Sequence, residues 1–198
     1  MNDTMKADKK ILLRNAKIYD GSGADAFVGD VLIENETITK VARDIPVSPD
    51  YHTIELDGLS LAPGFIDAHS HNDWFALRKE PNKFFEPFIR QGITTFISGN
   101  CGLSATAFRD ETPHKDKIGG GLFFFKDCPD FMGKVSDFLK AADRNMPCNL
   151  AVLAGHCTAR ASVSGSASRK LTEEEEKEML DILEEALQQG AAGSNGMV

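Results

Sequence analysis

Apolar and polar side chains alternate in short runs over the first 60 residues. Gly, Asn, Asp and Ser gather between these runs, most clearly at residues 20–23. Alternation with a period of two is typical of half-buried strands, and such polar clusters are typical of turns. We therefore predict a small antiparallel β unit over residues 1–60, a β-sandwich-type subdomain that is incomplete in this sequence. Its predicted strands are residues 11–14, 16–19, 31–34, 37–41 and 52–57.

From residue 61 onward, apolar strand-like runs alternate with segments of helical periodicity. This alternation indicates βα units around a parallel sheet, and a complete eight-stranded barrel needs about 250 residues. We therefore predict an α/β fold in which residues 61–198 form about four βα units, the N-terminal half of a TIM (β/α)8 barrel. The predicted strands are residues 61–67, 93–98 and 149–154 and a fourth from Ala191; the predicted helices are residues 82–91, shortened or bent by Pro87, 130–142, with Asp130 as N-cap, and 173–189.

The segment at residues 173–189 carries the clearest helix signals. Thr172 and Glu175 match a capping box, and Gly190 follows the last turn. The acidic run that begins at Glu173 suits the positive end of the helix dipole and is read as a solvated first turn. The face predicted to pack on the sheet consists of Met179, Leu183, Ala186 and Leu187.

Composition narrows the classes of partner. Lys and Arg total 22 against 30 for Asp and Glu, a net charge of -8 over 198 residues, and no basic run occurs. This balance argues against nucleic acid and anionic membranes as partners. No stretch reaches the roughly 20 apolar residues of a membrane span, so we expect a cytoplasmic protein. Because no Cys-x-x-Cys pair occurs, we expect free thiols, those of Cys128 and Cys148 being structural.

A pair of histidines follows the first strand of the predicted half barrel, in the motif Asp-Ala-His-Ser-His at residues 67–71. Side chains two positions apart in a strand share a face, so His69 and His71 point the same way as Asp67. Neutral imidazole is a good ligand for zinc, with bonds of about 2.0 to 2.1 Å. A His-x-His pair also arises by chance in a chain with five histidines, which leaves that alternative open.

A cysteine follows the second strand, in the motif Gly-Asn-Cys-Gly at residues 99–102. The carboxyl ends of parallel barrel strands meet at one mouth, so a thiolate from Cys101 would lie beside the two imidazoles. The flanking glycines permit a sharp turn. The alternative is that Cys101 is a small buried apolar residue, the commoner role of a lone free cysteine.

The third strand leads into Gly-His-Cys-Thr-Ala-Arg at residues 155–160. His156 could ligate a metal or orient a polar group, and Arg160 could pair bidentately with a substrate carboxylate. A structural role is an equal alternative for each of them.

Taken in order, these motifs resemble the N-acyl-D-amino-acid deacylases, the D-aminoacylase branch of the amidohydrolase superfamily. The segments at residues 16–23, 29–33 and 63–71 are similar to the superfamily's N-terminal part. The segments at residues 92–95, 99–102, 155–160 and 185–193 are more specific, and the cysteine after the second strand points to the deacylase branch.

The resemblance implies a zinc-dependent hydrolase, with one or two ions, that uses metal-activated water to cleave the amide bond of a small N-acyl-D-amino acid. It implies His69, His71 and Cys101 as metal ligands, and it places His156 and Arg160 near the substrate pocket. The family's two later metal histidines and its catalytic aspartate lie on later strands that this sequence does not contain. We therefore expect the 198-residue chain to be inactive alone.

Two other functions remain open at this point. A cyclic-amide hydrolase of the dihydroorotase or hydantoinase kind would keep the chemistry and change the substrate, although Cys101 favours the deacylase. A non-catalytic amidohydrolase-like remnant or subunit would tolerate substitution of His69, His71 and Cys101.

Overall fold

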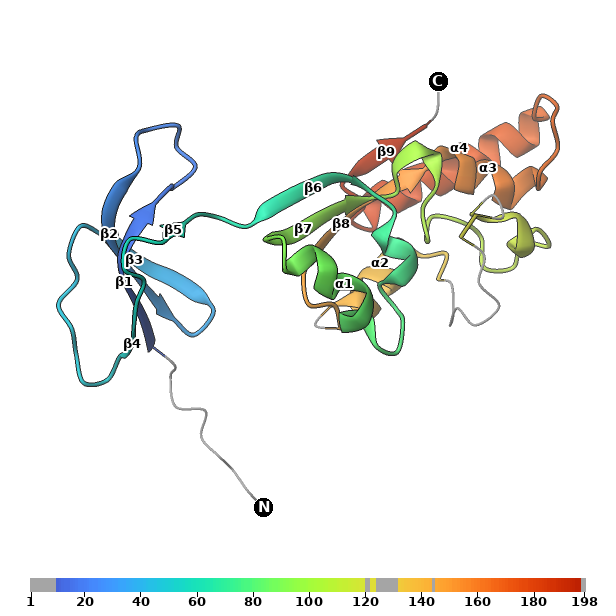
Figure 1. Cartoon of the computed structure of the whole chain (residues 1–198). Coiled ribbons are helices and arrows are strands. Elements are labelled where there is room, and N and C mark those ends of the chain that lie inside the picture. The colour runs from blue at the N-terminus through green and yellow to red at the C-terminus, as the bar shows by residue number, and fades with distance from the viewer. Residues whose placement is uncertain (1–9, 120–121, 124–131, 144, 197–198) are drawn as a thin grey trace, which may run out of the picture. The chain divides into compact units, whose positions relative to one another are not determined.

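The computed structural model describes residues 10–119, 122–123, 132–143 and 145–196. It divides the chain into two compact units, Met1–Pro63 and Gly64–Val198, which are described separately (Figure 1). Asp130, expected to cap a helix, and Cys128, expected to be structural, lie outside the described residues.

The first unit is a five-stranded sheet with the order β3-β2-β1-β4, to which β5 adds by pairing with β1. Its pairs β1–β2 and β2–β3 are antiparallel, as predicted, but β4 and β5 run parallel to β1. The prediction of an antiparallel unit was therefore wrong in part, because residues 43–51 carry the chain back to the start of β1 before β4 begins. The strands are β1 (Lys10–Ile18), β2 (Phe27–Glu34), β3 (Thr37–Ala42), β4 (His52–Glu55) and β5 (Ser60–Leu61).

Strand β1 is one continuous strand where the sequence pattern predicted two, residues 11–14 and 16–19. Its pairing register shifts between Leu13 and Ala16, where Asn15 takes a positive φ of 54°. The buried carboxylate of Asp30 accepts hydrogen bonds from the backbone N–H groups of Asn15 and Ile45, each 2.9 Å long. This carboxylate holds the bulge, so the strand continues past an irregular residue.

The second unit is built on a parallel sheet with the strand order β6-β7-β8-β9 (Figure 1). Consecutive parallel strands joined by helices are the arrangement predicted for residues 61–198, and the predicted strand at residues 93–98 coincides with β7. The strands are β6 (Phe65–Ser70), β7 (Ile93–Ser98), β8 (Asn149–Gly155) and β9 (Gly193–Asn195); the helices are α1 (Pro81–Ile89), α2 (Val135–Ala142), α3 (His156–Ser164) and α4 (Glu173–Gln188), with 3-10 turns η1 (Asn72–Phe75), η2 (Asn100–Gly102) and η3 (Lys115–Lys117).

Apolar faces of the helices cover this sheet. Phe85 of α1 is buried and its ring lies 5.6 Å from that of Phe96 on β7. Phe138 of α2 packs with Trp74 and Val152 in one core cluster. Helices α1 and α2 thus each pack on the strand that follows them in the chain, β7 and β8 respectively.

Helix α4 has the predicted capping box, in which the Thr172 hydroxyl accepts from the Glu175 N–H. Its buried side chains are Met179, Ile182 and Ala186, whereas Leu187 is 46% exposed. The predicted face was therefore wrong at Leu187. It also omitted Ile182, which lies three residues after Met179 and is buried on the same face.

Helix α3 was not predicted. Its short Ala, Ser and Thr side chains give little amphipathic signal, because no large apolar residue marks the buried side. Ala159 is fully buried against Met179 and Ile182 of α4, so tertiary packing rather than local pattern stabilises this helix. Helix α2 begins at Val135, five residues after its predicted N-cap.

No helix in the described part of the chain combines the length and apolar character that a bilayer crossing requires.

Candidate metal centre

The two histidines lie at the carboxyl end of β6. His69 is in the strand, and its backbone N–H donates to the Asp67 carboxylate at 3.1 Å. His71 is the first residue past the strand, with φ -123° and ψ 30°. Ser70 of β6 pairs with Ser98 of β7, so the carboxyl ends of the two strands lie side by side. The turn after β7 is thereby brought beside both imidazoles.

Cys101 lies in that turn and has a left-handed backbone, with φ 54° and ψ 23°. Gly99 and Gly102 on either side also have positive φ, 85° and 72°. A Cβ atom at Gly99 would collide with the carbonyl oxygen of Leu153, and one at Gly102 would lie 2.7 Å from the Cys157 Sγ. Both flanking positions therefore require glycine, which explains the tight Gly-Asn-Cys-Gly turn.

The three side chains converge. One ligand atom from each of His69, His71 and Cys101 lies within 4.8 Å of the others, and the Cys101 Sγ is 3.4 Å from the His69 Nε2. The imidazole rings are 6.1 Å apart between centroids, with their planes at 71°. In the described part of the chain this is the one group of His, Cys or acidic side chains close enough to share a cation.

The surroundings suit coordination by neutral imidazole. Burial lowers the pKa of His71, and the neighbouring His69 lowers it further, although a hydrogen bond with the Leu103 backbone acts in the opposite direction. The Nδ1 atom of His71 is buried with no hydrogen-bond partner within the described ranges. Nitrogen and thiolate sulfur form the donor set that zinc prefers, so these residues fit that ion.

A buried polar network lies behind the three side chains. The Ser70 and Ser98 hydroxyls are 2.7 Å apart, and the Asn100 amide donates to the Ile97 carbonyl at 2.9 Å. The carboxylate of Asp73 accepts from the Ala105 N–H at 2.7 Å. None of these residues was identified from the sequence, because single Ser, Asn and Asp residues carry no spacing signal. Ser70 and Asn100 stood within the recognised motifs, but no role was assigned to either.

Asp73 is an unusual member of this network. It is 1% exposed, and burial raises its pKa to about 7 despite hydrogen bonds from backbone N–H groups. Its Oδ1 atom has no hydrogen-bond partner within the described residues. The carboxyl group therefore joins the loop after β6 to the loop after β7, and its low-dielectric surroundings favour the protonated form.

His156 and Arg160 do not belong to the group of three. His156 is the first residue of α3, and the Arg160 guanidinium donates to the backbone carbonyl of Arg169, between α3 and α4. The hydrogen bond from Arg169 is the main cause of the lowered pKa of Glu175, and the nearby charge of Arg160 lowers this pKa further. These contacts are structural, and the substrate role of both residues stays a prediction.

The remaining described cysteines differ from Cys101. Cys148 is half-buried, and burial raises its pKa to about 11, so its thiol is inert at neutral pH. Cys157 is half-buried beside Gly102. Neither belongs to the candidate metal group.

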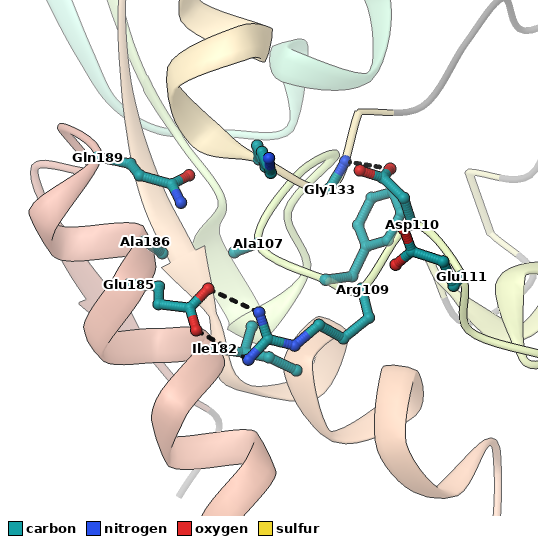
Figure 2. A pocket seen from close by; sticks show the side chains of 11 residues that line it. Ala107, Arg109, Asp110, Glu111, Gly133, Ile182, Glu185, Ala186 and Gln189 are labelled. Carbon is teal, nitrogen blue, oxygen red and sulfur yellow. Dashed lines mark hydrogen bonds and ion pairs between the residues drawn. The ribbon is translucent and has the colours of Figure 1, made fainter.

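A pocket elsewhere in the second unit is lined by α4 and the loop around residues 107–111. Figure 2 shows Arg109 paired there with Glu185 through hydrogen bonds of 2.6 and 2.9 Å. Its lining does not include His69, His71 or Cys101. The bidentate ion pair joins the loop to α4. Because the pocket shares no lining residue with the three candidate ligands, it is separate from the candidate metal centre.

Comparison with known proteins identifies the family of the chain. The amidohydrolase family model matches residues 52–194. The N-acyl-D-aspartate deacylase of Alcaligenes xylosoxydans xylosoxydans is 34% identical over 96% of this chain and 37% of its own length. The D-aminoacylase of the same organism is 33% identical over 92% of this chain and 36% of its own length. The chain thus spans just over a third of these relatives.

Solved structures give the same result. A D-aminoacylase structure superposes with a TM-score of 0.75 and 29% identity, covering 94% of this chain and 38% of that one. The N-acyl-D-glutamate deacylase of Bordetella bronchiseptica, solved with zinc and a phosphonate inhibitor, gives a TM-score of 0.71 and 25% identity over 96% and 38%. These similarities confirm the half-barrel fold and the resemblance drawn from the motifs. The chain belongs to the amidohydrolase family, and D-aminoacylases are among the members that it resembles.

Proposed function

We propose that this chain supplies metal ligands to the active site of a hydrolase that removes the acyl group from N-acyl-D-amino acids. One observation carries the proposal: the thiol of Cys101 and the imidazoles of His69 and His71 meet at the carboxyl ends of two neighbouring parallel strands. Active sites of barrel enzymes are built at this end of the strands. Similarity to two deacylases over more than nine tenths of the chain supports the substrate class.

Zinc is the proposed ion, and His69, His71 and Cys101 would hold it. When bound, such an ion polarises the scissile carbonyl and makes water a stronger nucleophile. The protein's own contribution is to present two neutral imidazoles and one thiolate. Burial lowers the pKa of His71 and so favours the neutral imidazole, whose nitrogen lone pair is available for coordination.

A cysteine coordinates a metal as its thiolate, so zinc binding would displace the thiol proton of Cys101. The soft sulfur favours zinc over magnesium or calcium, which prefer oxygen ligands. A negative thiolate also partly neutralises the cation.

The first test is metal binding by the purified chain. We expect one tight zinc site by calorimetric titration, and loss of that site in His69→Ala, His71→Ala and Cys101→Ala. His114→Ala is the matched control, because His114 lies outside the group of three. A non-catalytic scaffold would bind no zinc, or would bind it equally well in all four variants, and either result would refute the proposal.

The second test is turnover. The purified 198-residue chain should release little or no amino acid from N-acetyl-D-aspartate, because it spans 37% of the matching deacylase. A longer protein that contains this chain should hydrolyse N-acetyl-D-amino acids and spare their L-enantiomers. Preferential hydrolysis of dihydroorotate by that longer protein would establish the cyclic-amide alternative instead.

A further inference from the structure

The backbone of Cys101 is held in a conformation that its side chain disfavours. L-residues with φ near 54° bring Cβ close to the backbone, and non-glycine residues keep this conformation only where their surroundings enforce it. Gly99 and Gly102 permit the turn without enforcing it. Hydrogen bonds around the turn must therefore fix Cys101, and one of them runs from the Gly102 N–H to the Asn195 Oδ1 at 3.2 Å.

Asn100 has the contacts to do so. It is 5% exposed, and its amide nitrogen donates to the Ile97 carbonyl at 2.9 Å and to the Ser70 carbonyl at 3.4 Å. Its own backbone carbonyl accepts from the Leu103 N–H at 2.9 Å, which closes the turn over Cys101. The residue is thus hydrogen-bonded on both sides of the thiol-bearing position.

The bond to Ser70 joins the two parts of the ligand set. Ser70 stands between His69 and His71, so the Asn100 amide connects the backbone that carries both imidazoles to the turn that carries the thiol. The hydroxyl contact between Ser70 and Ser98 fixes the same two strand ends. A shift of the turn would change the 3.4 Å separation between the Cys101 Sγ and the His69 Nε2.

We infer that Asn100 is a positioning residue, whose amide bridge between the Ser70 and Ile97 carbonyls sets the distance from the Cys101 thiol to the histidines and thereby the metal affinity. The inference rests on the proposed function for its metal readout. It makes a chemical distinction: the bridge needs two N–H donors, which Asn has and the nearly isosteric Asp lacks.

The test compares Asn100→Asp and the milder Asn100→Ser with the unaltered chain by Co²⁺ titration. Cobalt bound to a thiolate gives a charge-transfer absorption, which reports the Cys101–metal bond directly. Loss of a hydrogen bond that orients a ligand costs about 10- to 100-fold in metal affinity, so we expect a weakening in that range and a weaker or shifted band. Ser162→Ala is the control, because the buried Ser162 hydroxyl is likewise hydrogen-bonded to the backbone, accepting from the Arg109 N–H, and lies outside the turn.

Asn100 variants that keep the affinity and the absorption band of the unaltered chain would overturn the inference. So would an equal loss in Ser162→Ala, which would trace the effect to general stability. Thermal melts of all variants identify any that do not fold, and Asn100→Ser is retained for the case in which Asn100→Asp does not.

A metal-free readout separates this inference from the proposed function. If the unaltered chain binds no Co²⁺, the proposed function fails, and crystal structures of the metal-free variants still test the positioning role. Movement of the Cys101 Sγ away from the His69 Nε2 supports the inference. Retention of the 3.4 Å contact and of the left-handed Cys101 backbone in Asn100→Ser overturns it.

Discussion

Gly99 combines two demands that usually occur separately. Its φ of 85° is unfavourable for any residue with a Cβ atom, and the Leu153 carbonyl occupies the space where that atom would stand. Gly190 shares the first demand alone: its φ is 106°, but the atom nearest to an added methyl group would be the flexible end of Leu139 at 3.4 Å. The pair therefore separates backbone strain from steric collision.

Gly99→Ala should destabilise the second unit more than Gly190→Ala does. Backbone strain costs about 1–3 kcal/mol in either variant, and the collision with Leu153 adds to it in the first alone. Urea unfolding followed by circular dichroism gives the two free energies of unfolding. Equal losses would mean that the strand end moves to accept the methyl group.

Asp73 makes stability depend on pH. Its pKa is raised to about 7 in the folded protein from an ordinary value near 3.8, so the folded state binds more protons than the unfolded state between these values. Stability that is present below about pH 4 is therefore lost as the pH rises through 7. Asp73→Asn keeps an acceptor for the Ala105 N–H and stays neutral.

We expect the melting temperature of metal-free Asp73→Asn to exceed that of the unaltered protein by more at pH 8 than at pH 5. Comparison of the two proteins at each pH removes the contribution of other carboxylates. A constant difference across this range would show that Asp73 does not titrate as its burial indicates.

The sequence identified the three candidate ligands because strand ends and motif spacing are visible in it. Parallel strands that follow one another must present their carboxyl ends together, which is why Cys101 could be associated with the histidines. The supporting residues Ser98, Asn100 and Asp73 were not accessible in this way. Their roles depend on hydrogen bonds across segments 25 to 32 residues apart, which leave no periodic trace.

Among the elements, α4 offers the cleanest test of local structure. Thr172→Ala removes the hydroxyl that accepts from the Glu175 N–H, and loss of such an N-cap costs about 1 kcal/mol. Glu174→Ala is the control, since Glu174 lies in the same first turn and takes no part in the capping box. A thermal melt that gives the two variants equal stability would contradict a role for the cap.

Elements with strong periodicity were predicted well. Strand β7 and helix α4 have an apolar pattern and clear end signals, so their bounds follow from local physics. Helix α3 and the direction of β4 do not, because the first is stabilised by packing on α4 and the second by pairing with β1. Both interactions join segments that are distant in the sequence, so a local pattern cannot predict them.

At the scale of the whole chain, the division after Pro63 predicts two unfolding transitions in calorimetry, since each unit has core clusters of its own. All three candidate ligands lie in the second unit. Zinc at about 100 times its dissociation constant should stabilise that unit by about 2.7 kcal/mol and leave the other transition in place.

Cys101→Ala is the control for this shift, because the variant lacks the thiol and should melt at the same temperatures with and without zinc. A shift of both transitions, or a shift that persists in the variant, would place the bound ion elsewhere.

The left-handed backbone at Cys101 also bears on how such a centre could be re-engineered. Aspartate and asparagine enter this conformation more readily than other residues with a side chain. Cys101→Asp would thus exchange a soft donor for a hard one while the turn keeps its shape, and ion preference would move from zinc toward manganese or magnesium. One amino-acid substitution would then change which metal ion the site prefers.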